Sequence, residues 1–136
     1  MKSLSSHGVE YLLIGGYAVG FHGYPRATAD LDVWVSISPK NAARIVDALK
    51  EFGFGTPDLK PSLFLLEDKV VRMGVPPLRI DILTSIGGVQ FHDCFERRQV
   101  ISIGDLELPV ISLADLKANK KATGRLQDLT DLEHLP

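Results

Sequence analysis

The stretch ATADLDVWV, residues 27–35, places two aspartates one residue apart in a run that otherwise has the pattern of a buried strand. Side chains alternate between the two faces of a strand. The three aliphatic residues of the run therefore share one face, while Asp30, Asp32 and Trp34 share the other. Two carboxylates on one face of a strand need a cation or a polar partner. The stretch thus predicts both a strand and a candidate site.

A second apolar stretch, LRIDIL at residues 78–83, adds a third carboxylate, Asp81. Three carboxylates brought together from two strands suit hard divalent cations, which prefer oxygen ligands and keep substrate phosphates in their coordination shell. Two Mg²⁺ ions about 3.5–4 Å apart can activate an attacking hydroxyl and stabilise a leaving pyrophosphate. The pattern therefore favours a site for Mg²⁺ or Mn²⁺.

A structural interpretation of the three aspartates stays open at this point. In it, Asp30 caps the strand or a turn, Asp32 is exposed on an edge, and Asp81 pairs with Arg79 or Arg72. Each of these roles is common for a single surface carboxylate.

Upstream of the aspartates, the apolar run 11–14 ends at Gly15-Gly16, and a short helix is expected over residues 17–22. Glycine lets backbone N–H groups approach phosphate oxygens closely, and a helix amino terminus assists. The pair is not part of a dinucleotide fingerprint, because the second glycine position of G-x-G-x-x-G falls on Tyr17.

The remaining pattern completes an α/β (α+β) fold, a mixed sheet of about five strands flanked by helices, in one domain over residues 1–136. A helix is expected from the cap Ser38-Pro39 to Gly53, and two short strands over 62–73, separated by residues 67–69. A hairpin is expected over 100–110 with its turn at Gly104-Asp105, followed by a helical region from Ser112 to Leu135 that is broken at Gly124.

Composition narrows the class of protein. Of 136 residues, 45% are hydrophobic and 24% charged, with no apolar run of membrane-spanning length, so we expect no membrane partner. The amino-terminal stretch lacks the pattern of a signal peptide, which predicts a cytoplasmic protein. The net charge of −2 argues against binding long duplex DNA. Cys94, the single cysteine, is expected to be a small buried hydrophobe.

The motifs together resemble the nucleotidyltransferase (DNA polymerase β-like) superfamily. The pattern is Ile14-Gly15-Gly16, then thirteen residues, then Asp30-Leu31-Asp32-Val33, with Asp81 on a later strand. Three longer stretches, GGYAVGFHGYPRATADLDVWV, LRIDILTSIGGVQF and DLKANKKATGRLQDLTDLEHL, are similar to the small bacterial branch akin to AbiEii-type toxins. The resemblance spans residues 9–135.

The resemblance implies a role for each motif. Asp30 and Asp32 would hold two Mg²⁺ or Mn²⁺ ions and the triphosphate, and Asp81 would hold the catalytic ion and help to deprotonate the acceptor hydroxyl. Gly15 and Gly16 would cradle the phosphates of an NTP. Many active relatives have Gly-Ser here, so Gly16 lacks one hydroxyl contact to phosphate.

Weaker candidates lie on both sides of the core motifs. Arg26 and Thr28 precede the aspartate pair and are candidate phosphate ligands, although a turn arginine is often only solvated. Lys120 matches the family's site-facing lysine, against the alternative of a solvated helix face. For Asp128 and Asp131, one helical turn apart, we favour a structural pairing with Arg125, and for His22 a capping or core position.

Two classes of function follow. The first is an enzyme that transfers an NMP from an NTP to a hydroxyl of tRNA, a protein or a small molecule, as the toxin of a toxin–antitoxin pair with a cognate partner. The second is a weakly active or inactive binding module, an antitoxin or partner subunit. A resistance transferase acting on aminoglycosides or lincosamides shares the core but usually has an additional domain, which disfavours it.

Overall fold

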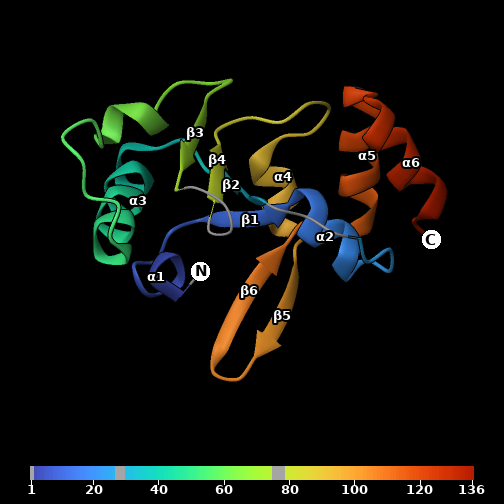
Figure 1. Cartoon of the computed structure of the whole chain (residues 1–136), viewed down its shortest axis with the longest axis horizontal. Helices are drawn as coiled ribbons and strands as arrows, with labels where there is room; N and C mark the ends of the chain where they lie inside the picture. Colours follow the sequence, from blue (N-terminus) through green and yellow to red (C-terminus); the bar gives the residue numbers. More distant parts are fainter. Residues whose placement is uncertain (1, 27–29, 75–78) are drawn as a thin grey trace.

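The computed structural model describes residues 2–26, 30–74 and 79–136 and forms one six-stranded mixed sheet with helices around it (Figure 1). The strands are β1 (Tyr11–Ile14), β2 (Asp30–Val35), β3 (Val70–Met73), β4 (Arg79–Leu83), β5 (Gln99–Ile103) and β6 (Leu106–Val110). The helices are α1 (Lys2–Ser6), α2 (Gly15–Phe21), α3 (Pro39–Phe52), the 3₁₀ turn η1 (Pro61–Phe64), α4 (Phe91–Glu96), α5 (Leu113–Thr123) and α6 (Leu126–His134).

The strand order is β3-β4-β2-β1-β6-β5. β2 pairs in parallel with β4 and antiparallel with β1, and β3 pairs antiparallel with β4. In this register Asp32 lies beside Asp81, and Ile14 lies on the other side of Asp32. The strand pairing therefore brings the two predicted aspartate strands together at the centre of the sheet.

The two faces of the sheet differ in character. Val33 and Ile82 are fully buried in the core on one face, and the cross-strand row that contains Asp32 and Asp81 lies on the other. α1 and α3 contact each other and lie at one side of the molecule in Figure 1, with α5 and α6 at the opposite side. The β5–β6 hairpin extends away from both groups. In the described part of the chain, no helix has the length and hydropathy that a transmembrane span needs.

Most of the expected elements are present. β1 has the predicted bounds, α3 begins after Ser38, whose hydroxyl accepts from the Asn41 N–H, and it ends at Gly53 in the left-handed conformation (φ 109°). The hairpin and the break at Gly124 are also confirmed. Cys94 is free and buried, as expected.

Three expectations need correction. The first of the two strands expected over 62–73 is instead the 3₁₀ turn Pro61–Phe64, in which Pro61 lacks an N–H for strand pairing and Phe64 anchors the turn in the core. The glycine pair belongs to the first turn of α2 rather than preceding it. The sheet has six strands rather than about five, and α1 and α4 were not expected.

A buried amide fixes β1 and β2 at the end away from the aspartates. Asn41 is 3% exposed; its carbonyl accepts from the Glu10 N–H at 2.8 Å, and its amide donates to the carbonyls of Glu10 at 3.1 Å and Ser36 at 2.8 Å. These bonds join the residue before β1 to the residue after β2 and to the first turn of α3. Asn41 therefore aligns the two strands whose other ends meet at Asp32.

We expect Asn41→Ala to lower the free energy of unfolding by about 2–4 kcal/mol, because it leaves buried backbone groups unpaired. Urea unfolding followed by circular dichroism measures the change. Lys40→Ala, at the exposed neighbouring position, should stay within about 0.5 kcal/mol of the native protein. Equal effects of the two substitutions would contradict this role of Asn41.

Candidate functional site

Strand register places the three aspartates on one face of the sheet. Because neighbouring strands of a sheet lie about 4.7–4.9 Å apart, the row Arg72–Asp81–Asp32–Ile14 across β3, β4, β2 and β1 brings two carboxylates side by side. Asp30 lies one pleat earlier on β2, beside Arg79. The structure thus brings together all three aspartates of the predicted site.

Two arginines neutralise two of these carboxylates. Arg72 donates from Nε and Nη2 to Asp81 at 2.8 and 3.0 Å, and Arg79 donates in the same way to Asp30 at 2.8 and 2.9 Å. The hydrogen bonds from Arg79 hold the pKa of Asp30 below its usual range, with burial opposing. Of the structural pairings left open above, Asp81 with Arg72 is present, whereas Arg79 takes Asp30 instead.

Asp32 has a different environment. Among the described residues it has no hydrogen bond and no ion pair, and it is partly buried rather than exposed on an edge. Burial, and then the charges of Asp81 and Asp30, raise the pKa of Asp32 to about 6. The carboxylate of Asp32 is therefore the least stabilised anion of the three, and it would gain most from a nearby cation.

Gly15 allows Asp32 to occupy this position. It has a φ of 65°, and a Cβ at Gly15 would overlap Oδ2 of Asp32 and lie 3.0 Å from the Cβ of Asp32. Only glycine satisfies both the left-handed backbone and this close approach. Gly16, by contrast, is buried within α2 and lies outside the described lining of the site cavity. The two predicted glycines thus have different positions relative to the site.

A cavity of about 620 Å³ opens over the aspartate row. It is lined by residues of β2, β3 and β4, by Ile14 and Gly15 at the junction of β1 and α2, by the segment after β4, and by α5 with the residue that caps α6. The charged side chains that line it are Asp30, Asp32, Arg72, Asp81, Lys120 and Arg125. Carboxylates and cations therefore line the same cavity.

Lys120 lies in this wall but is already paired. It is 4% exposed, and its ammonium lies 3.0 Å from Oδ1 of Asp128 and 3.1 Å from Oδ2 of Asp131. Although burial opposes it, hydrogen bonds from Arg125, Thr123 and Lys120 hold the pKa of Asp128 below its usual range. The interpretation of Lys120 as part of a solvated helix face is wrong, because this network buries it.

The same network contains Arg26, which donates from Nε and Nη2 to Asp131 at 2.9 and 3.0 Å. The predicted pairing of Arg125 with Asp128 is confirmed, whereas Asp131 pairs with Arg26 and Lys120 instead. Thr28 lies outside the described residues. The network joins the segment before β2 to α5 and α6, so it positions the cavity wall.

The donor set has the chemistry of a hard divalent-cation site, since three carboxylates share one face and the pKa of Asp32 is raised by burial and then by its acidic neighbours. In the conformation described, no group of three His, Cys, Asp or Glu among residues 2–26, 30–74 and 79–136 is arranged to hold a metal ion. Asp30 and Asp81 direct their oxygens to arginines instead. Metal binding would therefore require these two arginines to turn away.

Comparison with known proteins shows the fold. No protein-family model and no curated protein sequence matches the chain. Among solved structures, the chain is similar to that of "a putative nucleotidyltransferase" from Thermotoga maritima, with a TM-score of 0.63 over 97% of this chain and 84% of that one, at 15% sequence identity. At this identity the similarity shows the fold alone, which is the nucleotidyltransferase fold that the motifs predicted.

The raised pKa of Asp32 predicts a stability effect with a definite sign. The folded state binds the Asp32 proton more tightly than the unfolded state, so ionisation of Asp32 destabilises the fold as pH rises through about 6. Asp32→Asn should therefore be more stable than the native protein at pH 7.5, by on the order of 1 kcal/mol after allowance for solvent screening.

Thermal unfolding of both proteins between pH 4 and 8 measures this effect. The advantage of Asp32→Asn should shrink as the pH falls, because Asp32 is then protonated in the native protein as well. Asp47→Asn on α3, an exposed aspartate, is the matched control and should show no such trend. A lower stability of Asp32→Asn at pH 7.5 would contradict the assignment.

Proposed function

We propose that the protein is a metal-dependent nucleotidyltransferase that transfers a nucleoside monophosphate from an NTP to a hydroxyl acceptor. One observation supports this most directly: Asp30, Asp32 and Asp81 share one sheet face at the floor of a cavity, and Asp32 has no counter-charge paired to it among the described residues. A scaffold built only for stability would gain nothing from an anion in that position.

The reaction would proceed by in-line attack. The acceptor hydroxyl oxygen forms a bond to the α-phosphorus, the bond from the α-phosphorus to the bridging oxygen of the β-phosphate breaks, and pyrophosphate leaves with both electrons of that bond. The hydroxyl proton moves to a carboxylate oxygen of Asp81. Asp30, Asp32 and Asp81 would hold Mg²⁺ or Mn²⁺, which when bound neutralises charge on the phosphates and the attacking oxygen.

The residues of the cavity wall would orient the nucleotide. Gly15, at the start of α2, presents backbone to the cavity next to Asp32, where phosphate oxygens could approach without meeting a side chain. Lys120 stays in its network with Asp128 and Asp131, from which its charge favours the anionic form of Asp32. Gly16 and Arg26 would act indirectly, through α2 and through Asp131.

We further propose that Arg72 and Arg79 exchange partners during binding. A guanidinium matches carboxylate and phosphate equally well with two parallel hydrogen bonds. An arginine displaced from its aspartate by a metal ion would remain beside the triphosphate and bind it. The arginines would thus compete with a metal ion alone and assist a metal–nucleotide complex.

The carboxylate site is tested by release of pyrophosphate and by thermal shift. With Mg²⁺ or Mn²⁺ and each of the four NTPs, the native protein should release pyrophosphate with an acceptor from a panel of tRNA, proteins and small alcohols. Its melting temperature should rise with metal and NTP together. Asp32→Asn should lose both responses while it remains folded. Equal turnover by the variant would contradict the proposal.

Arg72→Gln separates the two effects of the arginine exchange. We expect Mn²⁺ alone to bind the variant several-fold more tightly, because a competing cation is removed from Asp81. The Mn²⁺–NTP complex should bind it several-fold more weakly, because one phosphate ligand is lost. Isothermal titration calorimetry measures both affinities, with Arg44→Gln on α3 as the control. Changes of the same sign would show that Arg72 does not exchange partners.

A second candidate function, a binding module without catalysis, has one observation in its favour. Asp30 and Asp81 are already paired with arginines through two hydrogen bonds each, so two of the three carboxylates are neutralised without metal. In that case the NTPs produce no metal-dependent thermal shift in the native protein.

The AbiEii-like branch, the toxin role and a cognate partner are supported by the resemblance of three sequence stretches, and the choice of acceptor in the pyrophosphate assay tests them.

A further inference from the structure

The sheet ends in two edge strands, β3 and β5, which differ in how they are protected. β3 carries Arg72, and a charge on an edge strand discourages pairing with another strand. β5 has the sequence QVISI, without a charge or a proline, and its hairpin with β6 extends away from the body of the molecule (Figure 1). Val100 and Ile103 are 51% and 60% exposed and lie on opposite faces of the strand. β5 is therefore an apolar edge strand that is exposed on both faces.

Hydrogen bonding on the far side of β6 shows which way the backbone groups of the hairpin point. The Ile111 N–H donates to the Leu13 carbonyl of β1 at 3.1 Å. Ile111 directly follows β6, and the backbone groups of successive residues in a strand point to opposite sides. Val110 therefore directs its N–H and C=O to β5, where its partner is Gln99.

The outward backbone groups of β5 follow from this pairing. Hydrogen-bonded and non-bonded pairs alternate along an antiparallel ladder, so Ile101 and Ile103 bond to β6 as Gln99 does. Val100 and Ser102 direct their N–H and C=O groups away from β6 instead. Among the described residues no hydrogen bond reaches these groups. They are free to pair with the edge of another strand.

Charges of opposite sign lie at the two ends of β5. Arg98, immediately before the strand, donates to the Phe95 carbonyl at 2.8 Å and lies over the Phe95 ring, without a carboxylate partner among the described residues. At the other end, Asp105 in the turn and Glu107 of β6 line a groove whose described lining contains no lysine or arginine. Antiparallel pairing of two such strands brings opposite charges together, whereas parallel pairing brings like charges together.

We propose that the protein forms a symmetric dimer in which β5 pairs antiparallel with β5 of a second copy and joins the two sheets into one. Complete overlap of the two strands places Ile101 opposite Ile101 of the other copy, at the two-fold axis. The same register places Val100 opposite Ser102 of the other copy. These two residues then exchange backbone hydrogen bonds, and symmetry repeats the exchange on the other side of the axis.

The side chains support the same register. Ile101 is the β6 partner of the buried Leu108, so Leu108 and Ile101 of both copies form one apolar row across four strands. Residues 97–98 of each copy lie beside the turn at Asp105 of the other, where Arg98 meets the acidic groove. Backbone groups, apolar side chains and charges therefore agree on a second copy of this chain as the partner of β5.

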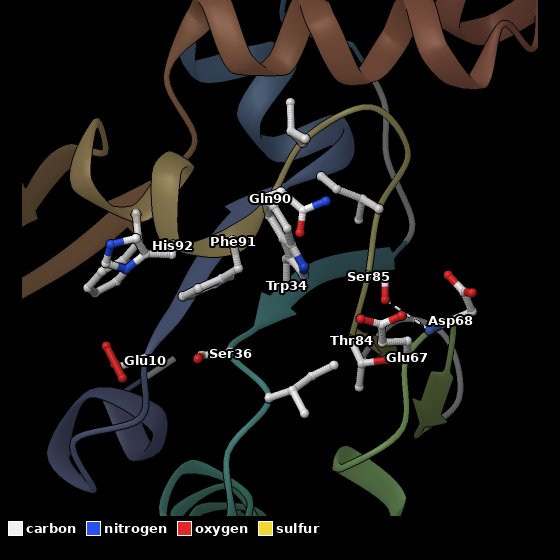
Figure 2. A pocket seen from close by; sticks show the side chains of 14 residues that line it. Glu10, Trp34, Ser36, Glu67, Asp68, Thr84, Ser85, Gln90, Phe91 and His92 are labelled. Atoms are coloured by element: carbon white, nitrogen blue, oxygen red, sulfur yellow. Dashed lines mark hydrogen bonds between the residues drawn. The ribbon is translucent and has the colours of Figure 1, made fainter.

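The proposed interface leaves the candidate site open. On the face of β2 that carries Trp34, a second cavity, of about 480 Å³, adjoins the aspartate cavity, since Ser85 and Ile86 line both. Figure 2 shows this second cavity around Trp34, with Glu67 and Asp68 in its lining. No residue of β5 or β6 is in the described lining of either cavity, and β1 and β6 separate β5 from β2. Pairing through β5 therefore does not depend on the proposed function.

Sedimentation velocity of the native chain at about 1–500 µM measures the association. We expect a reversible change from monomer to dimer without larger species, because the pairing uses β5 of both copies. Hydrogen exchange of the Val100 and Ser102 amides should slow as the dimer forms, while exchange in β3 stays constant. A chain that is still monomeric at about 0.5 mM overturns the proposal.

Ser102→Pro removes one of the outward N–H groups from each copy. Proline is tolerated on an edge strand where its nitrogen faces outward, so the hairpin with β6 should remain folded. Two bonds across the axis are lost, and we expect the dimer dissociation constant to rise about tenfold or more. Ser102→Ala keeps the N–H and should dimerise as the native chain does. Equal association of the two variants overturns the proposed backbone pairing.

Two charge reversals test the antiparallel orientation. Arg98→Glu brings acids together at both ends of the interface, and Asp105→Arg brings cations together. Each variant alone should dimerise roughly five- to thirtyfold more weakly. An equimolar mixture of the two variants should form a heterodimer with near-native affinity, because both contacts again join opposite charges. A mixture that associates no better than the separate variants overturns this orientation.

The opposite edge of the sheet provides a matched control. Val100→Lys should weaken the dimer, because a lysine on an edge strand opposes pairing. Val70→Lys on β3, where Val70 is 57% exposed, should leave the dimer unchanged. Dissociation by Val70→Lys, or growth beyond a dimer as the chain concentration rises, would show head-to-tail pairing of β3 with β5 and overturn the proposal.

Discussion

The parallel register between β2 and β4 is the constraint on which the site depends. It places Asp32 directly beside Asp81, with Asp30 one pleat away, so three carboxylates occupy adjacent positions on one face. Three adjacent carboxylates repel one another unless positive charges neutralise them, and the structure neutralises them unequally. Arg72 and Arg79 pair with Asp81 and Asp30, whereas Asp32 rests against Gly15 with a pKa raised to about 6 by burial and its acidic neighbours.

Much of this arrangement could be predicted because it follows from local pattern. Alternation along β2 puts Asp30, Asp32 and Trp34 on one face whatever the topology, and the glycine pair after β1 marks a tight approach. Ser38-Pro39 and Gly53 bound α3 by capping chemistry that residues close in sequence determine. The fold class followed from these elements, and the solved structure with the same fold agrees with it.

The rest depends on contacts between segments far apart in sequence. Arg79 is closer in sequence to Asp81 than to Asp30, yet parallel pairing across β2 and β4 gives it to Asp30 and leaves Asp81 to Arg72 of β3. Lys120 has the spacing of an exposed helical lysine, and only the return of α6 with Asp128 and Asp131 buries it. The expected strand before β3 fails because Phe64 enters the core from a 3₁₀ turn, which no alternation of residues reveals.

The two cavities on the aspartate face differ in the charged residues that line them, and a segment after β4 borders both. The first cavity has Arg72, Lys120 and Arg125 in its described lining beside its three aspartates, whereas the second has carboxylates and neither lysine nor arginine in its described lining. Ser85 borders both, and its hydroxyl accepts from the Asp68 N–H at 2.9 Å, which ties the acidic turn before β3 to the end of β4. The hydroxyl of Ser85 therefore holds the turn that carries the acidic residues of the second cavity against the strand that carries Asp81.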